Sequence, residues 1–375
     1  MDSKLLLAIA TLTGTIIGFG VFSIPYVMFK IGFLPGIFYL LILTAITILL
    51  HLIYGEIILR TKAICRLPGY AKNYLGEAGG SFASISTFIS VPFTLICYII
   101  AGGEFLSNIL NGPIFICSLL VWIILSLGLI LGITPISKIE LSISLLMLLI
   151  IGVIFLVSLP KINSENFSEF SPENFFLPYG VILFALAGAP AIPTLRYILR
   201  GREKDLKKAI IIGTLIPAFF YAIFSFAVIG VSGNQTSEEA ISGLVGKLGN
   251  NIILLGLLFG LMAILTSFLT FGIYLRDVLI LDFKMKKTLA TVLVMAISLV
   301  GVFLNKEYLI LLIGFIGVIM GAFEDVILLL ISRKAEVKFD RNPEWKINIP
   351  DPVVWLFCLV FIGGLVYEIL FFLKK

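Results

Sequence analysis

Eleven long apolar stretches make up most of this chain, separated by short polar or glycine- and proline-containing segments. A helix that crosses the hydrocarbon core of a membrane needs about 20 mostly apolar residues, which is the length of most of these stretches. Backbone groups in hydrocarbon must be satisfied within their own segment, so each stretch is predicted to be a helix. The predicted spans are residues 5–30, 33–55, 82–109, 114–133, 138–159, 176–198, 208–231, 251–276, 288–304, 308–331 and 352–372.

The composition excludes a soluble protein. Of the 375 residues, 60% are hydrophobic and 13% are charged, about half the charged share of soluble domains. The predicted fold class is therefore all-α integral membrane, as a single polytopic domain over residues 1–375. The longest polar stretches, 231–250 and 332–351, could hold only a short helix or a lid.

The basic residues predict the orientation, because cytoplasmic loops carry an excess of lysine and arginine. With the N-terminus in the cytoplasm, 21 of the 27 basic residues fall inside and six outside, and eleven spans place the C-terminus outside. The N-terminal apolar stretch has no cleavage site, so we expect a first span rather than a removable signal. The sequence predicts a multi-pass protein of the plasma (inner) membrane.

Two predicted spans contain breaks. The first reads Gly14-Thr-Ile-Ile-Gly18-Phe-Gly20, whose glycines lower helix stability, and the sixth contains Pro190 and Pro193, which each remove a backbone donor. Either break alone could serve only packing or a kink. Breaks at matching positions five helices apart instead indicate a transporter site between inverted repeats, here about residues 5–159 and 176–331, with an extra helix at about 352–372.

The backbone groups freed by these breaks predict the ligand. N–H groups near residue 18 and the positive end of the following half-helix suit a carboxylate. Carbonyl groups of residues 14–17 suit a cation, and those of residues 184–187 suit an ammonium group. An α-amino acid meets both needs. The candidate substrate-binding residues are Thr15, Ile16, Gly18, Phe19, Gly20, Phe184, Ala185, Ala187 and Gly188, with Tyr98 of the third span as a further contact for the carboxylate.

The eighth span carries unusual hydroxyl groups in Ala263-Ile-Leu-Thr266-Ser267, followed by Thr270. Such hydroxyls often bond back to the preceding turn. Beside the first break, we expect them to join backbone oxygens around a hard cation.

These segments resemble the amino acid–polyamine–organocation superfamily, and within it the amino acid/auxin permease branch and its bacterial aromatic and hydroxy amino acid permease relatives. Residues 14–26 are close to that family's first-helix signature. Residues 184–193 follow its sixth-helix pattern Phe-x-aromatic-x-x-His-Pro-Ala-Ile-Pro, except that Leu186 replaces the aromatic residue and Ala189 the histidine. Both replacements widen the pocket or reduce its polarity.

The resemblance implies the five-plus-five inverted-repeat fold of the leucine-transporter type, with an eleventh helix appended. In sodium-coupled members the ion lies between the first and eighth helices, and the motif assigns its ligands here to Gly14, Ile17, Ala263, Thr266 and Ser267. In proton-coupled relatives a lysine inside the fifth helix can replace the sodium. This fifth span has only Lys138, at its cytoplasmic end. Sodium is therefore favoured as the coupling ion, with no other cofactor.

Two acidic residues inside the tenth span, Glu324 and Asp325, are candidate gate residues. They could pair with Arg196 or Arg200 at an inner gate, or simply reach the interface. A single histidine and no paired carboxylates in register give no arrangement for catalysis, so no enzyme is expected. The four cysteines have no metal or redox spacing.

The predicted function is secondary active import of a neutral, hydrophobic or aromatic amino acid by sodium symport with alternating access. The alternatives are a proton-coupled symporter on the same fold and a membrane sensor that binds amino acids without carrying them. The expected partners are the substrate and membrane lipid, with no nucleic acid, and the protein is expected to be a monomer or weak dimer.

Overall fold

The computed structural model describes residues 3–131, 133–167, 170–304, 307, 309–337 and 339–374, which form helices joined by short connections. The helices are α1 (Ser3–Ile16), α2 (Gly20–Ile31), α3 (Phe33–Arg60), α4 (Leu67–Leu110), α5 (Ile114–Leu131), α6 (Ile133–Ser158), α7 (Leu177–Ala185), α8 (Ile192–Ile198), α9 (Leu206–Ser232), α10 (Asn250–Asp277), α11 (Lys287–Leu299), α12 (Leu309–Ile319), α13 (Val326–Val337) and α14 (Asp351–Lys374). A π-helical turn at Met320–Asp325 joins α12 to α13.

Each predicted span corresponds to helix in this structure. Within the described residues, nine helical segments are long and apolar enough to cross a membrane, and the bent pair α1 and α2 makes ten. The segment Lys287–Phe303, which contains α11, is shorter. The all-helical membrane fold is therefore confirmed, while the count of eleven crossings stays a prediction.

The third span begins earlier than predicted. α4 starts at Leu67 rather than at residue 82, with Pro68 in its first turn, where a proline needs no hydrogen bond. Gly76, at φ 81°, breaks this first portion from the long helix that follows. The side chain of Lys138, named in the sequence analysis, lies outside the described residues.

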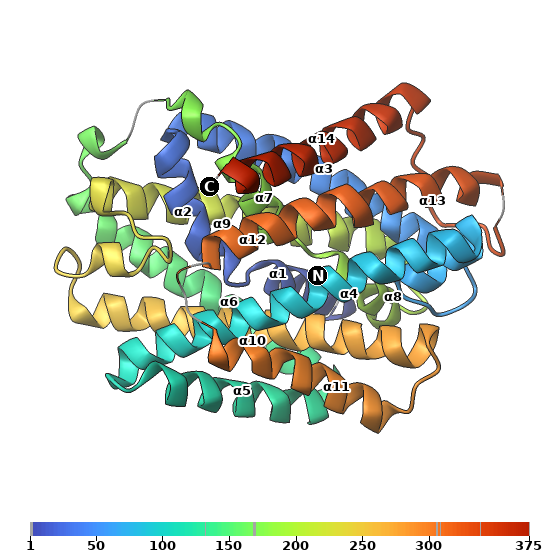
Figure 1. The fold of residues 1–375 in the computed structure, drawn as a ribbon, viewed down its shortest axis with the longest axis horizontal. Helices are drawn as coiled ribbons and strands as arrows, with labels where there is room; N and C mark the ends of the chain where they lie inside the picture. The colour runs from blue at the N-terminus through green and yellow to red at the C-terminus, as the bar shows by residue number, and fades with distance from the viewer. Residues whose placement is uncertain are drawn as a thin grey trace.

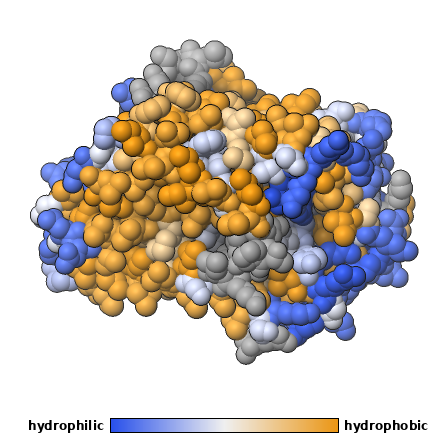
Figure 2. Space-filling model, turned by 90° about the horizontal axis from the view of Figure 1, so that it is seen from below, coloured by the Kyte–Doolittle hydropathy of each residue, from blue (hydrophilic) through white to orange (hydrophobic). Residues whose placement is uncertain are grey.

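The long helices run side by side across Figure 1, and the bent α1 and α2 occupy the middle of the bundle. From Ala8 to Pro25 nearly every residue of this pair is buried. By contrast, α5 and α14 expose many large apolar side chains. Figure 2 shows a broad hydrophobic surface between hydrophilic ends, as a membrane-embedded protein requires.

Loops gather at two ends of the bundle. At the end that we call the basic end, the Lys4 ammonium bonds to the Arg200 carbonyl, and Arg341 donates to the Leu59 carbonyl. At the opposite end, the Asn163 N–H bonds to the Gly230 carbonyl at 2.9 Å. Loops that the sequence assigns to one side of the membrane therefore do lie together.

Candidate functional site

The first predicted break is present. α1 ends at Ile16, α2 begins at Gly20, and the two helices are bent by 55°. Between them, the Gly18 N–H bonds back to the Ile16 carbonyl at 2.7 Å in a tight turn. No side chain caps α2, and the Val21 and Phe22 N–H groups bond to the Gly18 and Phe19 carbonyls at 3.3 and 3.0 Å. Among the described residues, the Phe19 and Gly20 N–H groups have no such bond and could serve a ligand.

The second predicted break is also present. α7 ends at Ala185 and α8 begins at Ile192, with a 3₁₀ turn at Ala189–Ala191 between them. The Ala187 N–H bonds to the Phe184 carbonyl at 3.1 Å, so the α-helical pattern is already lost there. Pro190 prevents the chain from resuming it at once.

The two breaks lie against each other. A Cβ atom built on Gly20 would stand 2.6 Å from the Ala185 Cα, and one on Gly188 would stand 2.8 Å from the Ile16 Cγ1. At Gly20 the neighbouring atom belongs to the backbone of α7, and only glycine permits such an approach of two backbones. All the candidate substrate residues are buried except Ala187, which is half-buried. The structure thus brings the predicted substrate-binding segments together in the interior.

One residue at this junction was missed by the sequence analysis. The Tyr221 hydroxyl of α9 reaches the Ile16 carbonyl at 2.5 Å and the Ala185 carbonyl at 2.9 Å, so one side chain touches the end of both half-helices. The only sequence signal is Pro217, one turn earlier, which interrupts the hydrogen bonding of α9.

The hydroxyl pair of α10 faces the first break. Thr266 Oγ1 lies 3.1 Å from the Gly14 carbonyl oxygen and 3.0 Å from that of Ala263. Ser267 Oγ lies 2.9 Å from the Thr15 carbonyl oxygen and 3.4 Å from that of Gly14. Thr266 Oγ1 also lies 3.3 Å from the Met262 carbonyl oxygen. Two hydroxyl protons thus face four carbonyl oxygens, and this oxygen-rich cluster has the chemistry of a hard-cation site.

Four of the five predicted cation ligands meet in this cluster. Ile17 is the exception: among the described residues its N–H bonds to the Thr13 carbonyl at 2.8 Å, and no hydrogen bond joins its own carbonyl to the hydroxyl pair. The structure adds the Thr15 carbonyl, which the motif did not include.

Tyr98 of α4 stands at the turn of the first break. A Cβ atom on Gly18 would lie 3.0 Å from the Tyr98 Oη and 2.8 Å from the Ser267 Oγ. The Tyr98 ring is 6.4 Å from that of Phe184 and 6.2 Å from that of Phe271, measured between centroids. Tyr98 therefore presents its hydroxyl to the predicted carboxylate position, and the three rings form an aromatic wall.

On the side of the breaks that faces away from the basic end, five buried phenylalanines pack together. Phe22 lies at the centre, with ring centroids 5.0 to 6.0 Å from the other four, which are Phe19, Phe105, Phe224 and Phe259. A cavity of about 290 Å³ adjoins Phe19 and Ser23, and its charged lining consists of Glu104, Glu238, Glu239 and Glu307. We call the five phenylalanines the phenylalanine plug and this cavity the acidic chamber. The two meet at Phe19, beside the first break.

The predicted gate pairing of Arg196 is not formed within the described residues of this structure, and it stays a prediction. Arg196 donates to the Ile58 carbonyl and, at 3.0 Å, to the Thr61 carbonyl, rather than to an acidic residue. Glu324 is buried and accepts a hydrogen bond of 2.5 Å from the Ser90 hydroxyl of α4. Within the described residues no ion pair joins Arg196 to Glu324 or to the half-buried Asp325. The π-helical turn aims Glu324 at α4 instead.

The basic end has a different ion pair, which the sequence did not suggest. The Arg66 guanidinium bonds to the Asp277 carboxylate and lies over the ring of Tyr274, 5.9 Å from its centroid. Although burial alone would lower the pKa of Arg66, the Asp277 carboxylate raises it overall, so the guanidinium keeps its charge.

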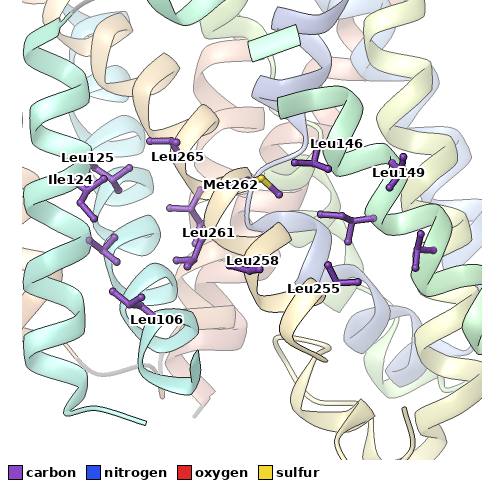
Figure 3. Close-up of a pocket in the computed structure, with 14 residues that line it drawn as sticks. Leu106, Ile124, Leu125, Leu146, Leu149, Leu255, Leu258, Leu261, Met262 and Leu265 are labelled. Atoms are coloured by element: carbon purple, nitrogen blue, oxygen red, sulfur yellow. The ribbon is translucent and has the colours of Figure 1, made fainter. Parts of the chain in front are cut away.

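A larger cavity lies away from the breaks. It has a volume of about 460 Å³, and its walls, from α4, α5, α6 and α10, are entirely apolar. Figure 3 shows leucines of α6 and α10 facing Ile124 and Leu125 of α5 across it. Ile124 and Leu149 are more than half exposed, so this cavity opens toward lipid and offers no polar group to a zwitterion.

The model of the tryptophan/tyrosine permease family matches residues 1–369. The chain belongs to this family. Its members are transporters, so the chain is a multi-pass membrane protein for amino acid transport and not an enzyme.

Two relatives of this permease are transporters by name. Glutamine transporter 2 of Aliivibrio fischeri is 24% identical over 355 residues, which cover 90% of this chain and 92% of the relative. Tyrosine-specific transport system 1 of Haemophilus influenzae is 25% identical over 281 residues, or 70% of each chain.

A solved structure has the same fold. It is Mhp1, a nucleobase-cation-symport-1 family transporter in a closed conformation with bromovinylhydantoin bound, with a TM-score of 0.68 at 13% sequence identity. The match covers 98% of this permease and 90% of that chain. At this identity the likeness is one of fold alone, and it confirms the predicted leucine-transporter type. Placement in the amino acid/auxin permease branch stays a prediction.

Proposed function

We propose that this permease imports a neutral, hydrophobic or aromatic amino acid together with sodium across the plasma membrane. The observation that carries the proposal is the contact between two buried helix breaks. The Phe19 and Gly20 N–H groups at the start of α2 suit a carboxylate, and the carbonyls that end α1 and α7 suit an ammonium group. A zwitterion of amino acid size satisfies both sets of groups at once.

The walls of the site favour an apolar side chain. Tyr98, Phe184 and Phe271 surround the first break with aromatic rings, and Leu186 and Ala189 place apolar groups at the second. A buried amide such as that of glutamine would need several hydrogen-bond partners, and among these side chains only Tyr98 carries a polar group, which faces the proposed carboxylate position. The tyrosine-specific relative is therefore the better guide to the substrate class.

Sodium is the proposed coupling ion. Gly14 and Thr15, whose carbonyls face the Thr266 and Ser267 hydroxyls, immediately precede the turn that would hold the substrate. Binding of an ion there would order the same turn that the amino acid needs, which is a physical basis for coupling.

The proposed architecture is the inverted repeat of residues 5–159 and 176–331, with the N-terminus in the cytoplasm. Access would alternate by the movement of one group of helices against the remaining ones. This group consists of the two broken helices (α1 with α2, and α7 with α8) together with α3 and α9. The phenylalanine plug would then open toward the acidic chamber.

Uptake into proteoliposomes under an imposed sodium gradient tests the proposal. Thr266→Ala and Ser267→Ala each remove one hydroxyl from the cluster, so we expect the sodium concentration for half-maximal uptake to rise about ten- to a hundredfold. Ser126→Ala is the matched control, because this buried hydroxyl of α5 has no hydrogen-bond partner in the described residues.

Three results would contradict parts of the proposal. Full sodium dependence in both variants would reject the cation site. Uptake driven by a proton gradient without sodium would favour the proton-coupled alternative. Saturable binding of amino acids without counterflow would favour the sensor.

A further inference from the structure

Two carbonyl groups from different helices converge on one phenol. The Tyr221 Oη lies 2.5 Å from the Ile16 oxygen and 2.9 Å from the Ala185 oxygen. Ile16 ends α1 and Ala185 ends α7, so both oxygens belong to the negative ends of half-helices. Tyr221 is completely buried, and its hydroxyl is therefore held at this junction.

The surrounding chain explains why Tyr221 reaches this point. Pro217 has no N–H, which leaves the Gly213 carbonyl without its helical donor, and the Thr13 hydroxyl of α1 donates to that carbonyl at 3.3 Å. A Cβ atom on Gly213 would lie 2.9 Å from the Leu12 Cβ, so the glycine lets α9 approach α1 closely. This docking carries Tyr221, one turn further on, to the gap between the breaks.

The phenol brings a single proton to this junction, where the Ile16 oxygen also accepts a hydrogen bond of 2.7 Å from the Gly18 N–H. A hydroxyl has one proton, yet two carbonyl oxygens lie within its reach. An ammonium group has three N–H donors and a positive charge, so it can serve both oxygens and is favoured by two converging negative helix ends. The junction is therefore better suited to an amine than to the group that fills it.

We propose that Tyr221 is an internal substitute for the substrate amine. In the ligand-free protein its hydroxyl occupies the amine position, and the incoming ammonium group displaces it. Tyr221 then acts as a specificity residue, because a ligand without an amine cannot replace the hydrogen bonds that it would break. This inference rests on the proposed function, since it takes the ligand to be an amino acid.

Displacement has a definite consequence for affinity. Removing an internal competitor strengthens the binding of the ligand that competes with it. Tyr221→Phe removes a competitor that is held by an ordinary hydrogen bond. We therefore expect the variant to lower the Kd for the amino acid about two- to tenfold. A ligand that does not displace the Tyr221 hydroxyl should have the same Kd for Tyr221→Phe as for the wild type.

The experiment measures Kd by titration calorimetry on the full-length purified protein. The probes are L-phenylalanine, L-tyrosine and L-tryptophan, each beside the acid that lacks its amine, such as 3-phenylpropionate. Tyr54→Phe is the matched control, because Tyr54 is equally buried but its hydroxyl has no hydrogen-bond partner in the described residues. We expect tighter binding of amino acids in Tyr221→Phe only, with no change for the amine-free acids.

Other outcomes overturn the proposal. Weaker amino acid binding in Tyr221→Phe would make the hydroxyl a direct ligand, and an equal change for amine-free acids would make its role structural. If wild-type protein binds no amino acid, the proposed function fails. If it binds and transports them but Tyr221→Phe gains no affinity, only the inference about Tyr221 fails.

A second measurement does not depend on the folding of that variant. 3-Fluorotyrosine placed at position 221 keeps the hydroxyl, and its ¹⁹F signal reports on the surroundings of the ring. We expect saturating amino acid to shift this signal, and the amine-free acid to leave it in place. An unchanged signal with bound amino acid would overturn displacement.

Discussion

At the scale of single residues, Gly20 offers the sharpest test of the contact between the breaks. Gly20→Ala would push α2 away from α7, because the added methyl group meets backbone and Cβ atoms of Ala185 at 2.6 to 2.7 Å. Overpacking of this kind destabilises a protein by about 1 to 3 kcal/mol. We expect a lower melting temperature and loss of uptake in proteoliposomes.

Gly152→Ala is the control for this glycine. Gly152 lies inside α6, and a Cβ atom there would meet nothing within 4 Å. Alanine favours a helix by about 1 kcal/mol over glycine, so we expect unchanged or slightly higher stability and normal uptake. Normal uptake in Gly20→Ala as well would show that the breaks need not touch.

The residues of the site differ in how far the sequence predicts them. Gly14, Thr266 and Ser267 belong to local motifs, and the structure does bring them together. Tyr221 could not be predicted, because its partners lie 205 and 36 residues away and no local pattern marks its hydroxyl. The pairing of Arg196 with Glu324 stays a prediction, since here Arg196 donates to backbone carbonyl groups of α3 and of the residue that follows it.

At the scale of elements, the polar segment 339–350 forms a strap across the basic end of α3. The Asp340 and Arg341 N–H groups both bond to the Arg60 carbonyl at 3.1 Å, and the Ile347 N–H bonds to the Glu56 carboxylate at 2.8 Å. Glu56 also forms a buried ion pair with Arg60. The sequence predicted only a short helix or lid here, because contacts with α3 are not encoded locally.

We expect Glu56→Gln to loosen this strap. The change removes the charge that balances buried Arg60 and weakens the bond to the Ile347 N–H. Trypsin should then cleave after Lys346 about three- to tenfold faster, because the free energy needed to detach the strap falls by roughly one hydrogen bond.

Glu77→Gln makes the same substitution in an exposed ion pair with Lys72, where little stability is at stake. It should leave the cleavage rate after Lys346 unchanged. Equal rates in wild type and Glu56→Gln would mean that the strap is held elsewhere.

At the scale of the whole molecule, Cys65 can report the orientation predicted from the basic residues. It is half-buried and lies between α3 and α4 at the basic end, whereas Cys97, Cys117 and Cys358 are buried. With the N-terminus in the cytoplasm, a membrane-impermeant maleimide should label Cys65 in inside-out vesicles and not in intact cells. Labelling of intact cells would reverse the orientation.

The labelling rate should also depend on pH. Burial, assisted by the Asp282 carboxylate, raises the pKa of the Cys65 thiol above its ordinary value near 9. Only the thiolate reacts, so the rate should still be rising at pH 9, where an exposed thiol would be half ionised. A rate that levels off below pH 9 would contradict this burial.

The bend between α1 and α2 also has a mechanical consequence. α2 has 12 residues and is therefore about 18 Å long, hinged at one tip by the three residues 17–19. Each ten degrees of swing at this hinge carries the far tip of α2 by about 3 Å, while groups beside the hinge scarcely move. A small change of angle at this hinge, around a bound molecule, therefore becomes a large displacement of the far tip of α2 near the membrane surface.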